Sequence, residues 1–315
     1  MTDSNQLDHL LIRYLTYLEV ERQVSQYTIR NYHHYLQRFL DFLDERNVDK
    51  TPKSIDMELI SQYRMFLSRY TDDLGRTLSR ATQAYHVIAV RSWFKWMIKR
   101  DVAVMAPEKI ELPKTESRSL KFLTAEQVER LLDQPRVASL PGLRDRTILE
   151  VLFSTGLRVS ELVKLNRDQI NLDKREFGVI GKGRKLRVVF LSERAVRWME
   201  RYENSRRDNW EPMFIRYARG KAPITSSGEK MRLTARSVQR LVEKYRKLAK
   251  LPVPITPHGL RHSFATDLLS HGAGLREVQE MLGHKNVATT QIYTHVTNPQ
   301  LKAVHQKYHS GNKPD

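Results

Sequence analysis

The second half of the chain contains short sequence motifs that could bind an anion. They carry two histidines, several cationic residues and one tyrosine. In ITPHGLRHSFATDLLSHG, Thr256 suits a helix N-cap and Pro257 the first helical position, so His258 and Arg261 should share a face near the helix N-terminus. A phosphate there would meet backbone N–H groups, an imidazole and a guanidinium together. The same residues also fit an ordinary surface helix.

Two further cations follow glycines. Arg158 comes two residues after Gly156 in STGLRVSELVKL, a place from which its side chain could project into a cleft or form a structural ion pair with Glu161. Lys182 lies between two glycines in IGKGRKLR, where a lysine can approach a duplex closely. Most lysines in turns are simply solvated, and this spacing is not that of a nucleotide-binding P-loop.

The last two candidates stand near the end of the chain. Gly283 in LREVQEMLGHKNV suits a helix C-cap, which would leave His284 just beyond the helix. Tyr293 follows nine residues later in TTQIYTHV. A tyrosine taken alone is usually explained by packing.

The composition of the chain limits the chemistry in which these candidate residues could take part. At 315 residues and 37.0 kDa the chain has enough material for two domains, and 40% of its residues are hydrophobic. It has no cysteine, which excludes disulfides, a thiol nucleophile and cysteine-ligated zinc. No apolar run is long enough to cross a bilayer, and the polar start MTDSNQLDHL is unlike a secretory signal, so we expect a cytoplasmic protein without a membrane partner.

The charge is strongly positive and unevenly distributed. The formal net charge is +18 and the pI is near 10.0. Residues 1–116 hold 17 basic and 16 acidic residues, whereas residues 117–315 hold 37 and 20. An excess of positive charge confined to one part of the chain favours a phosphate-binding surface over a charged surface that is merely solvated. Nucleic acid is therefore the leading candidate partner.

Hydrophobic periodicity divides the chain into two parts. Apolar residues at helical spacing predict four helices, over residues 7–22, 28–47, 57–70 and 79–101, which form a helical domain over residues 1–106. Trp93, Phe94 and Trp96 fit its core better than a base-stacking surface. Residues 107–121, with prolines and alternating charges, predict an extended linker.

The second domain, residues 122–315, should be mainly helical with a small β-hairpin. Thr124 and Gln127 have the spacing of a capping box, and a further helix should end near Gly156. The stretch EFGVIGKGRKLRVVFL has two β-branched runs around a glycine-rich basic turn, which is typical of a hairpin. The long charged segment 201–238 fits a variable surface loop.

Taken in order, the contexts TGLRVSEL, IGKGRK, HGLRHSFAT, LGHKN and TTQIYTHV resemble those of the tyrosine recombinase family, also called the phage integrase family, and most closely its compact Xer-type members. The resemblance covers essentially the whole chain. It implies a mainly α fold in two domains, with a four-helix, SAM-like core-binding domain that contacts DNA and a mixed α/β catalytic domain. It implies six catalytic residues: Arg158, Lys182, His258, Arg261, His284 and the nucleophile Tyr293.

The implied reaction is attack of a phenol on a phosphodiester, which needs charge stabilisation on the nonbridging oxygens and a proton for the leaving alkoxide. Arg158 and Arg261 suit the first need, with hydrogen bonds from His258 and His284, and the resemblance assigns the proton to Lys182. The product is a 3′-phosphotyrosyl enzyme. Neither ATP nor a metal ion is implied, and no metal site or other cofactor is expected.

The resemblance also implies partners. Family recombinases exchange strands between two double-stranded DNA sites, through a Holliday junction, within a tetramer that is either a homo-tetramer or shared with a second recombinase. We therefore expect a nucleoid-associated protein. Leu301, Val304 and Tyr308 could form an amphipathic segment that docks on a neighbouring subunit or on its own domain. Further candidate DNA contacts are Arg80, Arg91, Lys95, Arg184 and Lys185.

Two other functions stay open at this point. A type IB topoisomerase would use a similar tyrosine on a single duplex, and a DNA-binding regulator would bind without cutting. The sequence does not fix the DNA site or choose among chromosome partition, plasmid resolution and element mobility.

Overall fold

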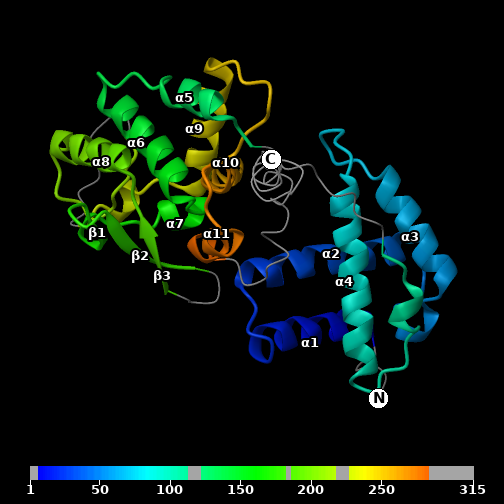
Figure 1. Cartoon of the computed structure of the whole chain (residues 1–315). Coiled ribbons are helices and arrows are strands. Elements are labelled where there is room, and N and C mark those ends of the chain that lie inside the picture. The colour runs from blue at the N-terminus through cyan, green and yellow to red at the C-terminus, as the bar shows by residue number, and fades with distance from the viewer. Residues whose placement is uncertain (1–5, 113–121, 182–185, 218–226, 284–315) are drawn as a thin grey trace, which may run out of the picture. The chain divides into compact units, whose positions relative to one another are not determined.

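The computed structural model describes residues 6–112, 122–181, 186–217 and 227–283. The chain divides into two compact units, unit 1 over Met1–Ser117 and unit 2 over Arg118–Asp315 (Figure 1). The described part of the chain is mostly helical with one small sheet, as the sequence predicted. No helix within the described ranges is long and apolar enough to cross a membrane.

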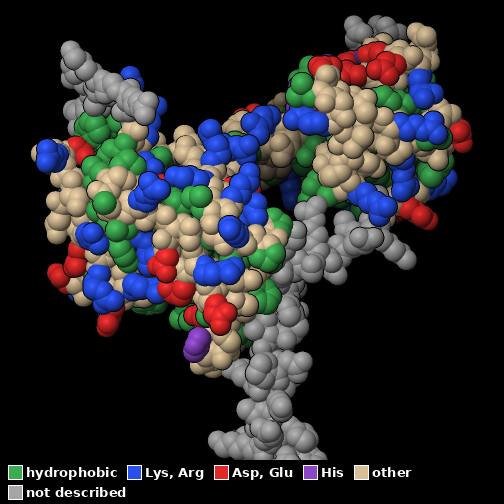
Figure 2. Space-filling model, turned by 90° about the horizontal axis from the view of Figure 1, so that it is seen from above, with side chains coloured by type: hydrophobic (Ala, Val, Ile, Leu, Met, Phe, Trp, Pro, Cys, Tyr) green, Lys and Arg blue, Asp and Glu red, His purple; other side chains and the backbone are tan. Residues whose placement is uncertain are grey.

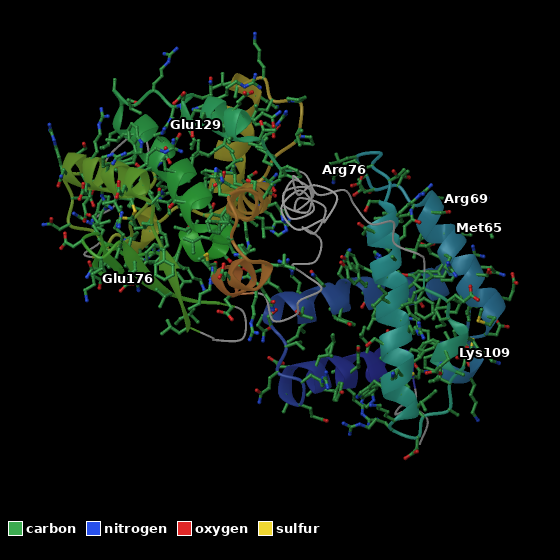
Figure 3. All side chains as sticks on the ribbon, viewed as in Figure 1. Met65, Arg69, Arg76, Lys109, Glu129 and Glu176 are labelled. Carbon is green, nitrogen blue, oxygen red and sulfur yellow. The ribbon has the colours of Figure 1, made fainter. Side chains whose placement is uncertain are left out.

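Unit 1 contains the four expected helices, α1 (Leu7–Val20), α2 (Gln26–Glu45), α3 (Met57–Arg69) and α4 (Arg80–Ile98), with short 3-10 turns at Pro52–Ser54 and Pro107–Lys109. Local chemistry explains where three of them begin. The side chains of Ser25, Asp56 and Ser79 accept hydrogen bonds from backbone N–H groups in the first turns of α2, α3 and α4. Arg76, in the connection between α3 and α4, pairs with Asp72 (Figure 3).

The core of unit 1 is rich in aromatic side chains. Trp93 is fully buried, and its indole N–H donates to the carbonyl of Leu10 at 3.4 Å. Phe94 and Trp96 are also buried, which confirms that this cluster belongs to the core. Phe39, Phe42 and Tyr63 pack on one another with ring centroids 4.8 to 6.5 Å apart, which links α2 to α3.

Unit 2 is built around α6 (Leu140–Thr155), which is buried along most of its surface and packs against α8 (Glu193–Ser205) and α10 (Pro257–Ser270). The remaining elements surround it in Figure 1. They are α5 (Ala125–Leu132), α7 (Val159–Leu162), α9 (Ala235–Leu248) and α11 (Leu275–Leu282), with 3-10 turns at Arg167–Gln169 and Glu229–Met231. Thr124 and Gln127 form the expected capping box at the start of α5.

The sheet of unit 2 has three antiparallel strands in the order β1 (Ile170–Asn171), β2 (Glu176–Ile180) and β3 (Leu186–Phe190). Strands β2 and β3 confirm the predicted hairpin; β1, only two residues long, was not predicted. Phe177 and Val189 face each other across the ladder on the buried side. Arg187 lies on that same side, paired with Val179, and its side chain is only 11% exposed.

The segment 201–238 is anchored more firmly than the expected surface loop where the structure describes it. Arg206 is buried and donates to the carbonyls of Pro212 at 2.7 Å and Met213 at 3.0 Å. Arg232 donates to the carbonyls of Val163 and Leu165, both at 3.1 Å. Arg206 braces residues 206–213 from within, whereas Arg232 ties residues 227–238 to the body of unit 2. The N–H of Met213 also donates to the carbonyl of Leu165 at 2.9 Å. Residues 218–226 lie outside the described ranges.

Replacing Trp93 with alanine should destabilise unit 1 by about 3–5 kcal/mol, because the change leaves a cavity and removes the indole hydrogen bond to the carbonyl of Leu10. Ile98→Ala on the same helix is the matched control, since Ile98 is 43% exposed. Urea denaturation of both variants checks this. An equal loss of unfolding free energy in the two variants would contradict the conclusion that Trp93 is a main contributor to the core of unit 1.

Candidate active site

The structure describes three of the six predicted catalytic residues, Arg158, His258 and Arg261, all in unit 2. Lys182, His284 and Tyr293 lie outside the described residues, as do the candidate DNA contacts Arg184 and Lys185. The roles of all six catalytic residues therefore remain predictions.

Arg261 is positioned by α10. The side chain of Thr256 accepts the N–H of Gly259 at 3.2 Å and Pro257 occupies the first turn, so this helix begins where the sequence predicted. Arg261 lies one turn later and is only 2% exposed. Its guanidinium donates to the carbonyl of Gly156 at 2.7 Å and to the carbonyl of Leu282. Arg261 thereby joins α10 to the C-terminal ends of α6 and α11.

Gly156 makes this close approach possible. It caps α6 in the left-handed region, with φ of 60°, and its N–H donates to the carbonyl of Leu152 at 3.1 Å. A Cβ atom at this position would lie 2.5 Å from the ring of Phe264 on α10. Glycine is therefore required both by the backbone conformation and by the packing of α10 against the end of α6.

Arg158 follows this cap and is held by Glu161. The carboxylate of Glu161 accepts the backbone N–H of Arg158 at 2.8 Å and its Nη1–H at 2.9 Å. The structure thus contains the ion pair that the sequence suggested as one alternative. The side chain of Arg158 is still 33% exposed, so this pair orients the guanidinium while leaving it accessible.

Glu161 is the buried centre of this arrangement. Its side chain is 6% exposed and also accepts two N–H groups from Arg187, both at 2.9 Å. Burial alone would raise the pKa of Glu161, but hydrogen bonds and charge from Arg187 and Arg158 outweigh it and lower the pKa to about 2. Glu161 is therefore a carboxylate at neutral pH, able to hold both arginines.

His258 lies in the first turn of α10, three residues before Arg261, and is exposed. Partial desolvation of its ring lowers its pKa, and the positive charges of Arg261 and Arg158 lower it further. The ring of His258 contacts that of His262 edge to face, with centroids 4.4 Å apart. The neutral imidazole is thus favoured, in which one ring nitrogen donates a hydrogen bond and the other accepts one.

Together these groups form a cationic site at the N-terminal end of α10. Arg158, His258 and Arg261 come from two segments about a hundred residues apart, and the charges of both arginines act on the histidine. Such a site can bind a phosphate and stabilise negative charge that develops on its oxygens. Within the described ranges, no group of three or more His, Asp or Glu side chains is placed to hold a metal ion.

In unit 1, the candidate DNA contacts Arg80, Arg91 and Lys95 all lie on α4. Residues eleven apart on a helix are offset by about 20°, and residues four apart by about 40°, so the three share one sector. Arg80 and Lys95 are exposed and Arg91 is half-buried. Trp93, on the opposite side of the same helix, is fully buried. Figure 2 shows that Lys and Arg side chains are also spread over the visible face of unit 2.

Sequence reasoning missed one residue of the site, Arg187. It donates to both oxygens of Glu161 and, through Nε, to the carbonyl of Met281 at 3.2 Å. A signal was present in LRVVF, because Arg187 and Val189 are two apart and must share a face of the strand. An arginine on the inward face of a hairpin calls for a buried acidic partner.

Comparisons with known proteins agree with this architecture. Residues 121–299 match the model of the phage integrase family, and residues 11–101 match that of the phage integrase N-terminal SAM-like domain. Tyrosine recombinase XerD of Staphylococcus epidermidis is 32% identical over 304 residues, covering 96% of this chain and 99% of the relative. XerD of Pseudomonas putida is 34% identical over 308 residues, covering 96% and 98%.

Solved structures share the fold. XerH recombinase bound to a palindromic difH substrate, in a post-cleavage complex, matches with a TM-score of 0.68 and 23% identity over 94% of this chain and 83% of that chain. A lambda integrase dimer bound to a COC′ core site matches with a TM-score of 0.67 and 18% identity over 90% and 97%. The chain belongs to the phage integrase family; it is a tyrosine recombinase, an enzyme that transfers DNA strands.

Replacing Glu161 with glutamine should lower the stability of unit 2 by about 3 kcal/mol at pH 7, because the lowered pKa measures how strongly the fold favours the carboxylate. Because the pKa of Glu161 is lower in the folded state, its carboxylate stabilises the fold fully above the ordinary glutamate pKa of 4.5, and this stabilisation is lost as the pH falls toward about 2. The gap between wild type and variant should therefore shrink below about pH 5.

Calorimetric melting at several pH values measures this gap, with Glu193→Gln as the control. Glu193 pairs with Arg175 but its side chain is 71% exposed, so its loss should be small at every pH. A gap for Glu161→Gln that did not change between pH 7 and pH 3 would show that the carboxylate charge is not what stabilises the site.

Proposed function

We propose that this enzyme is an Xer-like site-specific recombinase whose Tyr293 cleaves DNA. The observation that carries the proposal is the cluster of Arg158, His258 and Arg261 at the start of α10, where two guanidinium charges act on one imidazole. That set of groups suits a phosphodiester in the transition state of strand transfer. Lys182, His284 and Tyr293 complete the set by their positions in the sequence.

In the proposed step the phenol of Tyr293 gives its proton to water, its oxygen attacks the scissile phosphorus, and the bond from phosphorus to the 5′-oxygen breaks. Lys182 supplies the proton that the departing 5′-oxygen takes up, and the 3′-phosphate stays on the tyrosine. Arg158 and Arg261 stabilise charge on the nonbridging oxygens, and His258 and His284 donate hydrogen bonds to them. Attack by a 5′-hydroxyl of another strand reverses the step and joins that strand.

The partner we propose is double-stranded DNA that carries a specific recombination site. XerH was solved with a difH substrate and lambda integrase with a core site, and this chain shares their fold. We further propose a tetramer on DNA, either of identical subunits or shared with a second recombinase, that proceeds through a Holliday junction. Its place would be the cytoplasm, associated with the nucleoid.

Topoisomerase activity and non-catalytic regulation are less favoured. The curated relatives that cover 96% of this chain are named tyrosine recombinases. A regulator that had lost catalysis would not need the cationic set, and the sequence retains every member of it.

Covalent trapping tests the chemistry. The protein is incubated with nicked duplexes selected from a random pool for tight binding, with EDTA present, and run on a denaturing gel. We expect a slow-migrating adduct that leaves a free 5′-hydroxyl and is abolished in Tyr293→Phe. Tyr308→Phe, a second tyrosine of the same C-terminal stretch, is the control and should keep the adduct. An adduct that persisted in Tyr293→Phe would exclude this nucleophile.

Salt titration tests the DNA contacts proposed for α4. Replacing Arg80, Arg91 and Lys95 together with alanine should weaken binding to any duplex sequence. It should also reduce the slope of log K against log salt by about 2 to 3, because each lost phosphate contact removes about 0.9.

The control variant replaces Arg22, Lys53 and Lys109, three exposed cations of unit 1 (Lys109 is labelled in Figure 3), and has the same change in net charge. A similar reduction of slope in both variants would point to a diffuse charge effect and against α4 as a contact surface.

A further inference from the structure

Arg187 lies at the meeting point of three segments that each carry a predicted catalytic residue. It stands on β3, five residues after Lys182 in the chain. Its guanidinium binds Glu161, which holds Arg158, and the carbonyl of Met281 near the end of α11. His284 follows that helix end by two residues. Elements α7, α11 and β3 lie together in Figure 1, and α11 packs on β3.

The contacts of Arg187 are specific to a guanidinium. Two parallel N–H groups meet the two oxygens of Glu161 at 2.9 Å, while Nε–H points to the carbonyl of Met281 at 3.2 Å. Only the planar fork of arginine can serve a carboxylate with two bonds and a third acceptor at the same time. A lysine would keep the charge but lose this geometry.

The side chain is also fixed by packing. A Cβ atom on Gly283 would lie 3.0 Å from Cδ of Arg187, so the stem of the arginine fills the space beside this residue. Gly283 caps α11 in the left-handed region, with φ of 64°. Arg187 therefore contacts the backbone directly before His284 as well as the carboxylate that orients Arg158.

Arg187 is enclosed within unit 2. Its side chain is only 11% exposed, and its described hydrogen bonds go to Glu161 and to a backbone carbonyl. Arg158, held by the other N–H bonds to Glu161, is three times as exposed, at 33%. The buried arginine thus supports the accessible one through a shared carboxylate.

We propose that Arg187 is a positioning residue for strand cleavage, which sets the orientation of Arg158 through Glu161 and fixes the end of α11 before His284. The proposal rests on the proposed function, because it concerns the rate of the same cleavage step. A guanidinium displaced by about 1 Å from the scissile phosphate can cost about 100-fold in rate. Loss of Arg187 should therefore slow cleavage without weakening DNA binding.

The test compares Arg187→Met with wild type in single-turnover cleavage of the nicked duplex selected for tight binding. We expect the cleavage rate to fall by about 100-fold while the dissociation constant for DNA changes by less than about threefold. Arg187→Lys should recover part of the rate. Arg175→Met removes an arginine–glutamate pair near the same sheet and should leave the rate unchanged.

A second substrate separates positioning from general loss of structure. In a duplex with a methylphosphonate at the scissile position, one nonbridging oxygen is replaced by methyl and the negative charge is gone, so cleavage depends less on Arg158. Arg187→Met should lose no more than about 10-fold on this substrate. Equal losses on both substrates would overturn the proposal in favour of a merely structural role.

A double-mutant cycle tests the route through Glu161. If Arg187 acts through this carboxylate, Arg187→Met should have little further effect on the rate in a Glu161→Gln background. Full additivity would overturn the proposal, as would a wild-type rate in Arg187→Met or a parallel loss of DNA binding. Failure of wild type itself to form an adduct would instead contradict the proposed function.

Discussion

A buried guanidinium must find an acceptor for its N–H groups, and unit 2 is organised around this requirement. Arg261 is 2% exposed and uses the carbonyls of Gly156 and Leu282. Leaving such a charge without partners would cost several kcal/mol, so the ends of α6 and α11 must stay where the guanidinium can reach them. The carbonyls of helix C-termini are suitable acceptors because they have no partner within their own helix.

Four arginines of unit 2 differ in how far they are enclosed. Arg187, Arg206 and Arg261 are largely enclosed and bind carboxylates or carbonyls of their own unit. Arg158 is more open, and the exposed His258 lies within reach of its charge. The enclosed cations lose little freedom when a ligand binds, because the fold has already ordered them. That rigidity is what a preorganised phosphate site requires.

Features set by neighbouring residues were predictable from the sequence, and those set by distant contacts were not. The caps at Thr124 and Thr256 depend on bonds across three residues, and each was found where the sequence placed it. The Arg158–Glu161 pair is equally local. In contrast, Arg187 reaches Met281 across 94 positions, and Arg232 reaches Val163 across 69. No pattern in the sequence specifies those partners, and strand β1 is too short to show a period.

The two left-handed glycines have a consequence for how this protein can change over time. A Cβ atom on Gly156 would lie 2.5 Å from the ring of Phe264, and one on Gly283 would lie 3.0 Å from Cδ of Arg187. A substitution at either glycine would disturb the arginines without altering any group that meets the substrate. A change at the facing residue could make room for a side chain at either glycine, although the left-handed backbone would still disfavour it. Substitutions at Gly156 and Phe264, and at Gly283 and Arg187, are therefore expected to occur together, although the two residues of each pair lie far apart along the chain.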